Sequence, residues 1–198
     1  MSGPVRRRTR ARESALQYLY MLEVRGSESQ EELDDFIEHQ TKASRDPRSR
    51  GEIAAFAREI CVGVPANRGE IDRWIESIAR NWRLDRMALV DRNVLRLALY
   101  ELLFHPDTPY KVVINEAIEI AKRFSTAQSG SFVNGILDRA RVLIEQARAE
   151  GEAHPQPPPA PTAEERPPER APRKVPQDPF FSPPVPRPRR REDHSQTD

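Results

Sequence analysis

A cluster of arginines at the start of the chain is the feature that most directly indicates chemistry. No acidic residue precedes Glu13, and the cluster comprises Arg6, Arg7, Arg8, Arg10 and Arg12. On a helix, members four residues apart would repel each other by about 0.3 kcal/mol. Guanidinium groups bind phosphate oxygens two at a time and are weakly hydrated. The cluster therefore favours an anionic partner, with nucleic acid first, and the alternative is a solvated, frayed chain end.

The charge balance makes this cluster informative, because the 198-residue chain has a formal net charge of only +1. A nucleic-acid site must then be a local feature of the surface rather than a property of the whole protein. The average composition, with 37% hydrophobic and 32% charged residues, combines two unlike parts. Most of the 19 prolines lie between Pro155 and Pro188.

The residues that catalysis or a cofactor would require do not form a recognisable site. The four histidines lack metal-ligand spacing, the glycines form no phosphate-binding loop, and Glu116 and Glu119 lack histidine partners. Cys61 is the only cysteine, which excludes a disulfide within the chain and favours a buried structural thiol. The sequence predicts a binding protein without catalysis and without a cofactor.

The start of the chain has no apolar segment typical of a secretory signal, and no run of residues is apolar enough to span a membrane. We therefore expect a reduced, cytoplasmic setting and no membrane partner.

Helical periodicity accounts for the first 150 residues, and no run alternates with period two. The predicted helices have short connections, which is typical of an all-α bundle. Ser29 is predicted to cap the second helix, Gly63 and Pro65 to close the third, and Asp85 to cap the fifth. The seven expected segments are 11–22, 29–40, 53–64, 71–82, 85–103, 112–124 and 132–144, with loops at 42–50, 105–109 and 125–131.

The composition changes at Glu150, after which proline, glutamate, arginine and alanine dominate. Such a segment buries too little to offset its ordering entropy. We expect a folded domain over residues 1–149 and a disordered Pro/Arg/Glu-rich tail over 150–198. The tail either keeps the protein soluble or, through the basic run Pro186–Arg191, adds non-specific attraction to RNA.

Three blocks of sequence resemble one known family, in order along the chain. They read RRRTRARESALQYLY from Arg6, VDRNVLRLALYEL from Val90, and DTPYKVVINEAIEIAKRFSTAQSGSFVNGILDR from Asp107. Together they resemble the NusB family of bacterial transcription antitermination factors over roughly residues 5–147. The resemblance implies an all-α, seven-helix bundle of two helical subdomains without catalysis.

The same resemblance implies a function and partners. Proteins of this family bind boxA, a single-stranded RNA element in the leaders of ribosomal RNA operons, together with the small-subunit ribosomal protein NusE. The complex joins RNA polymerase and other Nus factors and suppresses premature termination.

Residues of this chain fall on the family's RNA-binding positions. Cations neutralise phosphates, and an aromatic ring offers an unpaired base a stacking face. For Tyr20 the alternative is a core position. The connection before Phe132 can present backbone N–H groups to phosphate, but its sequence Thr126–Ser131 lacks the acidic and basic residues that relatives often carry. The resemblance assigns RNA binding to Arg6, Arg7, Arg8, Arg10, Tyr20 and Phe132, and Lys111 is added as a further phosphate contact.

Two acidic residues are the candidates for contact with NusE. Asp91 occupies the place of an acidic partner-contacting residue, and Glu101 is the second candidate. The alternative for both is an ion pair within their own helix.

A rival interpretation is a substrate-holding module, because NusB-like domains also precede ribosomal RNA cytosine methyltransferases. The chain lacks a glycine-rich cofactor motif and a catalytic cysteine pair, so methyl transfer would need a second polypeptide. A protein-only scaffold that never contacts RNA is the other alternative.

Overall fold

Seven α-helices and one short 3-10 turn make up the fold in a computed structural model that describes residues 4–25, 30–79 and 82–159. The predicted cap Ser29 and the basic run Pro186–Arg191 lie outside these ranges. The elements are α1 (Pro4–Arg25), α2 (Gln30–Thr41), α3 (Pro47–Ala66), α4 (Arg68–Ile78), η1 (Leu84–Arg86), α5 (Leu89–Phe104), α6 (Tyr110–Phe124) and α7 (Ser129–Ala149).

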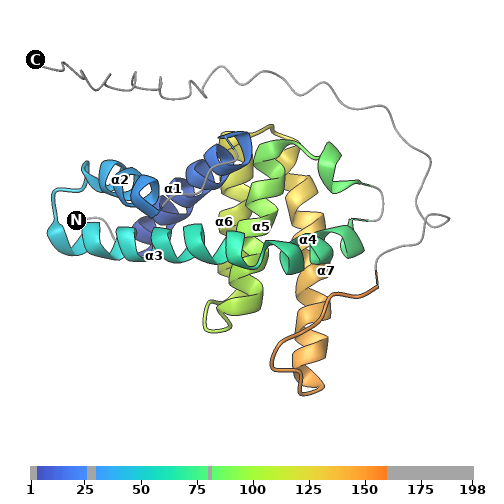
Figure 1. Cartoon of the computed structure of the whole chain (residues 1–198). Helices are drawn as coiled ribbons and strands as arrows, with labels where there is room; N and C mark the ends of the chain where they lie inside the picture. The colour runs from blue at the N-terminus through green and yellow to red at the C-terminus, as the bar shows by residue number, and fades with distance from the viewer. Residues whose placement is uncertain (1–3, 26–29, 80–81, 160–198) are drawn as a thin grey trace, which may run out of the picture.

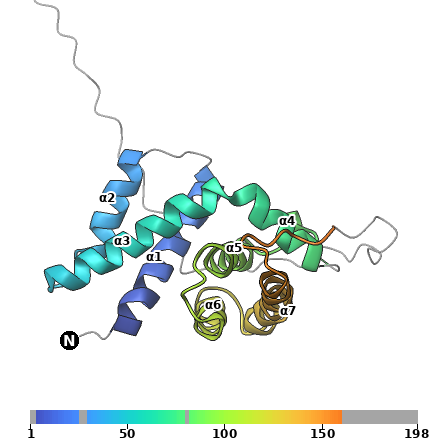
Figure 2. The same ribbon diagram turned by 90° about the horizontal axis from the view of Figure 1, so that it is seen from below.

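The helices form two groups that meet at α5. In Figure 1, α5, α6 and α7 stand side by side, and Figure 2 shows the same three helices end-on with α1, α2 and α3 to one side. Both α1 and α3 pack on α5, which links the groups. Every residue from Asp91 to Leu103 is buried, as expected for a helix covered on several sides. The all-α, seven-helix prediction is confirmed.

The third helix begins earlier and continues further than the sequence suggested. The Asp46 side chain accepts hydrogen bonds from the backbone N–H groups of Arg48 and Ser49, and Pro47 occupies the first turn. Gly63 and Pro65 do not close the helix, which runs to Ala66. Gly63 instead allows close approach of α5, because a Cβ there would lie 2.1 Å from the hydroxyl oxygen of Tyr100.

The stretch between α4 and α5 also differs from the prediction. The fourth helix ends at Ile78, so Trp82 lies outside it, and Asp85 lies in η1 instead of capping α5. The apolar spacing of Trp82 continued the pattern of α4, but the chain turns at Ala79, whose carbonyl accepts the N–H of Trp82 at 2.9 Å.

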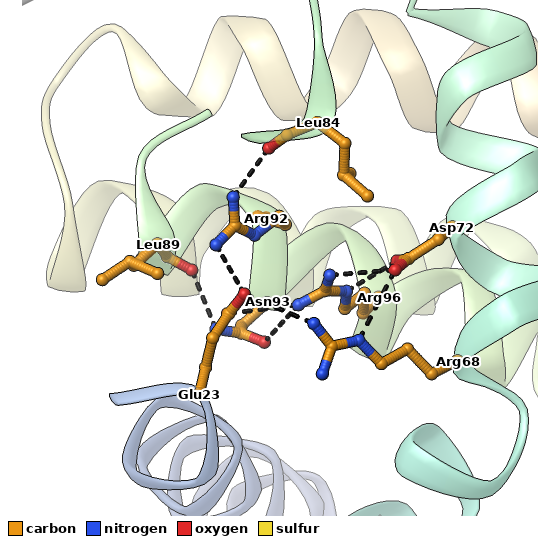
Figure 3. Close-up of polar contacts among 8 residues, drawn as sticks. All are labelled: Glu23, Arg68, Asp72, Leu84, Leu89, Arg92, Asn93 and Arg96. Atoms are coloured by element: carbon orange, nitrogen blue, oxygen red, sulfur yellow. Dashed lines mark hydrogen bonds and ion pairs between the residues drawn. The ribbon is translucent and has the colours of Figure 1, made fainter. Parts of the chain in front are cut away.

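A network of ion pairs joins α1, α4 and α5, as Figure 3 shows. The Glu23 carboxylate accepts hydrogen bonds from Arg92 at 2.5 Å, Asn93 at 2.8 Å and Arg96 at 3.1 Å. Arg96 also donates to both carboxylate oxygens of Asp72, at 2.7 and 3.0 Å. Burial alone would raise the pKa of Glu23, but the charges of Arg96 and Arg92 and the bonds from Arg92 and Asn93 hold it below its usual value. The network fixes the end of α1 against the start of α5.

Cys61 is buried, as expected, and its burial raises the pKa of the thiol to about 12. Residues 150–159 are the first part of the predicted tail; most are exposed, but His154 and Pro155 lie against the helices. The Nε2 atom of His154 is 2.8 Å from Glu70 Oε1, its ring centroid is 5.3 Å from that of Phe104, and Pro155 is buried. The remainder of the tail lies outside the described residues.

Candidate RNA and partner interface

The first turns of α1 carry the arginine cluster, and its members face different surroundings. Arg6 and Arg8 are exposed, whereas Arg7 and Arg10 are half-buried. The Arg7 Nε is 2.6 Å from Glu52 Oε2 on α3. Arg8 contacts Thr108 at 3.5 Å, and its guanidinium lies 4.9 Å from the centroid of the Phe56 ring. These side chains lie at the border of the surface where α1, α3 and the α5–α6 connection meet.

Arg12 belongs to the interior, although the sequence places it in the same cluster. It is 2% exposed and donates to both carboxylate oxygens of Glu101, at 2.7 and 2.6 Å. Glu116 Oε2 lies 3.5 Å from the same guanidinium. The spacing explains this burial, since Arg12 precedes Ala15 and Leu16 by three and four residues and shares their core-facing side.

Glu101 cannot serve as a contact for a partner in this structure, so the prediction for it is wrong. Its exposure is 0%, and both of its carboxylate oxygens accept hydrogen bonds from Arg12. The alternative of a pair within α5 is also wrong for this residue, because Arg12 comes from α1. A carboxylate that is fully buried, as in the last turn of α5, requires such a counter-charge.

Asp91 is largely buried at the start of α5, with 8% of its surface exposed. Its Oδ2 atom accepts a hydrogen bond from Ser129 Oγ at 3.0 Å, and the same hydroxyl is 3.0 Å from Ser125 Oγ and 2.9 Å from Thr126 Oγ1. Asp91 thereby holds the α6–α7 connection and the start of α7. Burial raises the pKa of Asp91, and the hydrogen bonds from Ser125 and Ser129 offset part of that rise.

This raised pKa predicts how an Asp91→Asn variant responds to pH. Above the folded-state pKa, wild type carries a buried charge that the variant lacks. We expect the variant to be at least as stable as wild type at pH 7.5. As pH falls through the folded pKa towards the lower unfolded value, the folded state takes up a proton first, so the difference shrinks. Urea unfolding at pH 7.5 and 4.5 measures the stability difference between the variant and wild type at each pH. An Asp91→Asn variant less stable than wild type by more than about 1 kcal/mol at pH 7.5 would contradict the prediction.

Phe132 lies in the first turn of α7, half-buried, at the end of the molecule where Asp91 is found. Its ring packs edge-to-face on Trp82, with centroids 5.4 Å apart. Tyr20 is half-buried on the last part of α1, three residues before Glu23. Lys111 is exposed at the start of α6, three residues after Thr108, which contacts Arg8.

Six of the seven predicted RNA-binding residues form two groups, and Tyr20, on the last part of α1, belongs to neither. The arginines and Lys111 lie near the α5–α6 connection, at the lower end of α6 in Figure 1, and Phe132 lies beyond its upper end. The 15 residues of α6 separate these ends by about 22 Å. A ligand that touches both groups must span this distance, which an unpaired nucleic-acid strand can do.

Sequence reasoning missed Trp82, which it assigned to the apolar side of α4. The indole is 41% exposed and contacts Phe132. The available signal was its neighbours, since Arg80 and Arg83 flank it in a short polar stretch.

No described helix is long and apolar enough to cross a membrane. Among residues 4–25, 30–79 and 82–159, no three histidine, cysteine, aspartate or glutamate side chains are placed to hold a metal ion.

The chain has relatives among known proteins. The chain is similar to the transcription antitermination protein NusB of Myxococcus xanthus (strain DK1622), 48% identical over 139 residues that cover 70% of this chain and 96% of the relative. It is 52% identical over 133 residues to the NusB of Anaeromyxobacter sp. (strain Fw109-5), covering 67% of this chain and 88% of the relative.

Solved structures match as well. A structure of T. maritima NusB matches with a TM-score of 0.59 and 42% identity, covering 72% of this chain and 93% of that one. A crystal structure of the antitermination factors NusB and NusE in complex with dsRNA matches with a TM-score of 0.60 and 26% identity. The match covers 69% of this chain and 97% of that one. The model of the NusB family matches residues 9–141, and with these identities the chain belongs to the NusB family of transcription antitermination proteins.

Proposed function

We propose that this protein binds boxA RNA of ribosomal RNA operon leaders together with NusE, and so supports efficient ribosomal RNA transcription in the cytoplasm. The observation that carries the proposal is the likeness to a NusB crystallised with NusE and RNA, which extends over 97% of that chain. RNA polymerase and the other Nus factors are proposed as indirect partners. The family is one of non-enzymatic antitermination factors.

The surface supports an extended RNA strand. Arg6, Arg8 and Lys111 are exposed cations near one end of α6, where they can neutralise phosphates. Phe132 offers a partly exposed ring at the other end, beside the N-terminal turn of a 21-residue helix. We assign phosphate contacts to the arginines and Lys111, and base stacking to Phe132 and Tyr20.

Asp91 is the remaining proposed contact for NusE. Because only 8% of it is exposed, it can offer no more than one edge of its carboxylate. Its larger effect on a partner is positional, through the hydrogen bond to Ser129 that fixes the start of α7.

A binding titration tests the proposed function. The full chain is titrated into a labelled boxA RNA oligonucleotide, with and without NusE, and an RNA of the same composition in scrambled order serves as the control. We expect NusE to tighten binding to boxA and to leave the scrambled RNA weakly bound. Equal affinity for both RNAs in the presence of NusE would contradict the proposal.

The alternative of a module for a methyltransferase has no observation in its favour. The first relatives are antitermination proteins, and this chain covers 95% or more of their length. Labelling of ribosomal RNA by the pure protein with S-adenosylmethionine would revive that alternative.

Replacing Phe132 by alanine is expected to weaken boxA binding by about 1–3 kcal/mol, the value of one base stacked on an aromatic ring. Because Phe132 also packs against the core, we expect the free energy of unfolding to fall by about 1 kcal/mol, well below the 3–5 kcal/mol of a buried phenylalanine. RNA titration and urea unfolding of the same sample measure the two effects. A stability loss of 3 kcal/mol or more with unchanged RNA affinity would make Phe132 a core residue only.

A further inference from the structure

Trp82 has a side chain whose exposure the fold does not explain. The chain contains two tryptophans, of which Trp74 is 1% exposed and Trp82 is 41% exposed. An indole is large, flat and mostly apolar, so leaving two-fifths of it in water forgoes hydrophobic stabilisation. Trp82 itself nevertheless has fixed partners, since its N–H donates to the Ala79 carbonyl at 2.9 Å and its ring packs on Phe132. A fixed, exposed ring of this kind is typical of a binding surface.

The ring geometry gives Trp82 a face of its own. The planes of Trp82 and Phe132 are inclined by 67°, with centroids 5.4 Å apart. Two rings at this angle cannot lie parallel to the same base, because a stacked base is parallel to the ring it covers. Trp82 therefore does not duplicate the stacking surface of Phe132 but adds a second one beside it.

The charges around the indole favour RNA over a protein surface. Arg83 and Arg86 follow it and are both exposed, and Asp85 is the one acidic residue among them. Asp85 binds the Arg83 guanidinium through both oxygens, at 3.1 and 2.9 Å, and the formal charges of residues 82–86 sum to one positive charge. A ring next to cations suits a base with its phosphate.

We propose that Trp82 stacks on a second unpaired base of the bound RNA, next to the base at Phe132, and so extends the RNA site to the segment between α4 and α5. This inference rests on the proposed function and names a residue that the family resemblance did not supply. The two rings then hold neighbouring bases turned away from each other.

Tryptophan fluorescence of the full-length protein provides the first test, because Trp82 itself is the probe and no label has to be added. Trp74 is buried, so added RNA can reach only Trp82. We expect saturating boxA RNA with NusE to quench wild-type emission and to protect it from acrylamide. A Trp82→Phe variant retains Trp74 alone and should show neither effect.

Affinity provides the second test. We expect Trp82→Ala to weaken boxA binding about tenfold, and Trp82→Phe to stay within about threefold of wild type because a ring remains. The slope of log K against log salt should not change in either variant, since no phosphate contact is lost. Val142→Ala is the matched control, as it removes a 36% exposed apolar side chain on α7.

A double variant separates stacking from mere support of Phe132. If Trp82 binds its own base, Trp82→Ala should still weaken boxA binding in the Phe132→Ala background, although the two fold-changes need not multiply because the rings are in contact. If Trp82→Ala causes no further loss of RNA affinity in the Phe132→Ala background, the proposal is overturned, and the same holds if Trp82→Ala alone binds RNA as tightly as wild type.

A contact with NusE is the competing outcome. If Trp82→Ala weakens NusE binding in the absence of RNA while its RNA affinity is unchanged, the proposal is also overturned and the ring is a protein contact. If wild type itself fails to prefer boxA, the proposed function fails along with this inference; the other outcomes leave that function intact.

Discussion

Replacing Glu101 by alanine is expected to lower the free energy of unfolding by about 3–5 kcal/mol, the range for breaking one side of a buried ion pair. Arg12 and Glu101 are 2% and 0% exposed and share two hydrogen bonds. Without Glu101, the guanidinium stays buried beside the Phe56 ring, 5.3 Å from its centroid. Only Glu116 remains as a counter-charge, at 3.5 Å, which is too far for a good hydrogen bond.

Urea unfolding at neutral pH measures this loss. Glu119→Ala is the matched control, since it breaks a pair with Lys122 on the exposed side of α6 and should change stability by less than about 1 kcal/mol. The double variant Arg12→Leu/Glu101→Leu should recover most of the loss, because neither charge then remains unpaired. A Glu101→Ala variant within 1 kcal/mol of wild type would contradict the burial of this pair.

The contrast between Asp91 and Glu101 shows what the ion-pair arrangement does. Both are buried acidic residues on α5, yet only Glu101 has a guanidinium against both oxygens. Asp91 Oδ1 is buried without a hydrogen-bond partner among the described residues, and its other oxygen accepts from a neutral hydroxyl. Neutralising Asp91 therefore removes a buried charge that has no cationic partner, whereas removing Glu101 leaves the buried Arg12 guanidinium without its main counter-charge.

The helices could be predicted from the sequence because each buries one side of a repeating apolar pattern. The predicted sixth helix, Val112–Phe124, ends at the same residue as α6. The predicted seventh helix starts at Phe132, three residues after the observed start of α7 at Ser129. Errors occurred where local signals competed. Asp46 and Asp85 are both plausible caps, but only Asp46 precedes a proline that can begin a helix.

The candidate site was less predictable than the fold, because its arrangement depends on contacts between distant segments. Arg12 and Arg8 have the same side chain and lie one helical turn apart, yet the first pairs with Glu101 and the second contacts Thr108 at the surface. Nothing local to residue 101 identifies a partner 89 positions away. Similarly, Trp82 fitted the pattern of α4, and only the turn at Ala79 brings it to Phe132.

Replacing Arg6, Arg7 and Arg8 together by alanine is expected to have the largest effect on RNA binding. If about four arginines each neutralise one phosphate of a single strand, log K falls with log salt at a slope near −3. Removing three of them should bring the slope near −1 and weaken binding at low salt by about 100-fold. The folded state should change little, since Arg6 and Arg8 are exposed.

The contacts of Arg7 do not prevent it from taking part. Its partner Glu52 is 42% exposed and also binds Arg48 at 3.2 Å, so exchanging this pair for a phosphate costs less than about 1 kcal/mol. The matched control is the triple variant of Arg45, Arg73 and Arg139 to alanine, because all three are exposed and remove the same charge elsewhere. Its slope should stay close to that of wild type if phosphate contacts are local. Equal slopes for both triple variants would show that net charge alone attracts the RNA, and would remove the start of α1 from the interface.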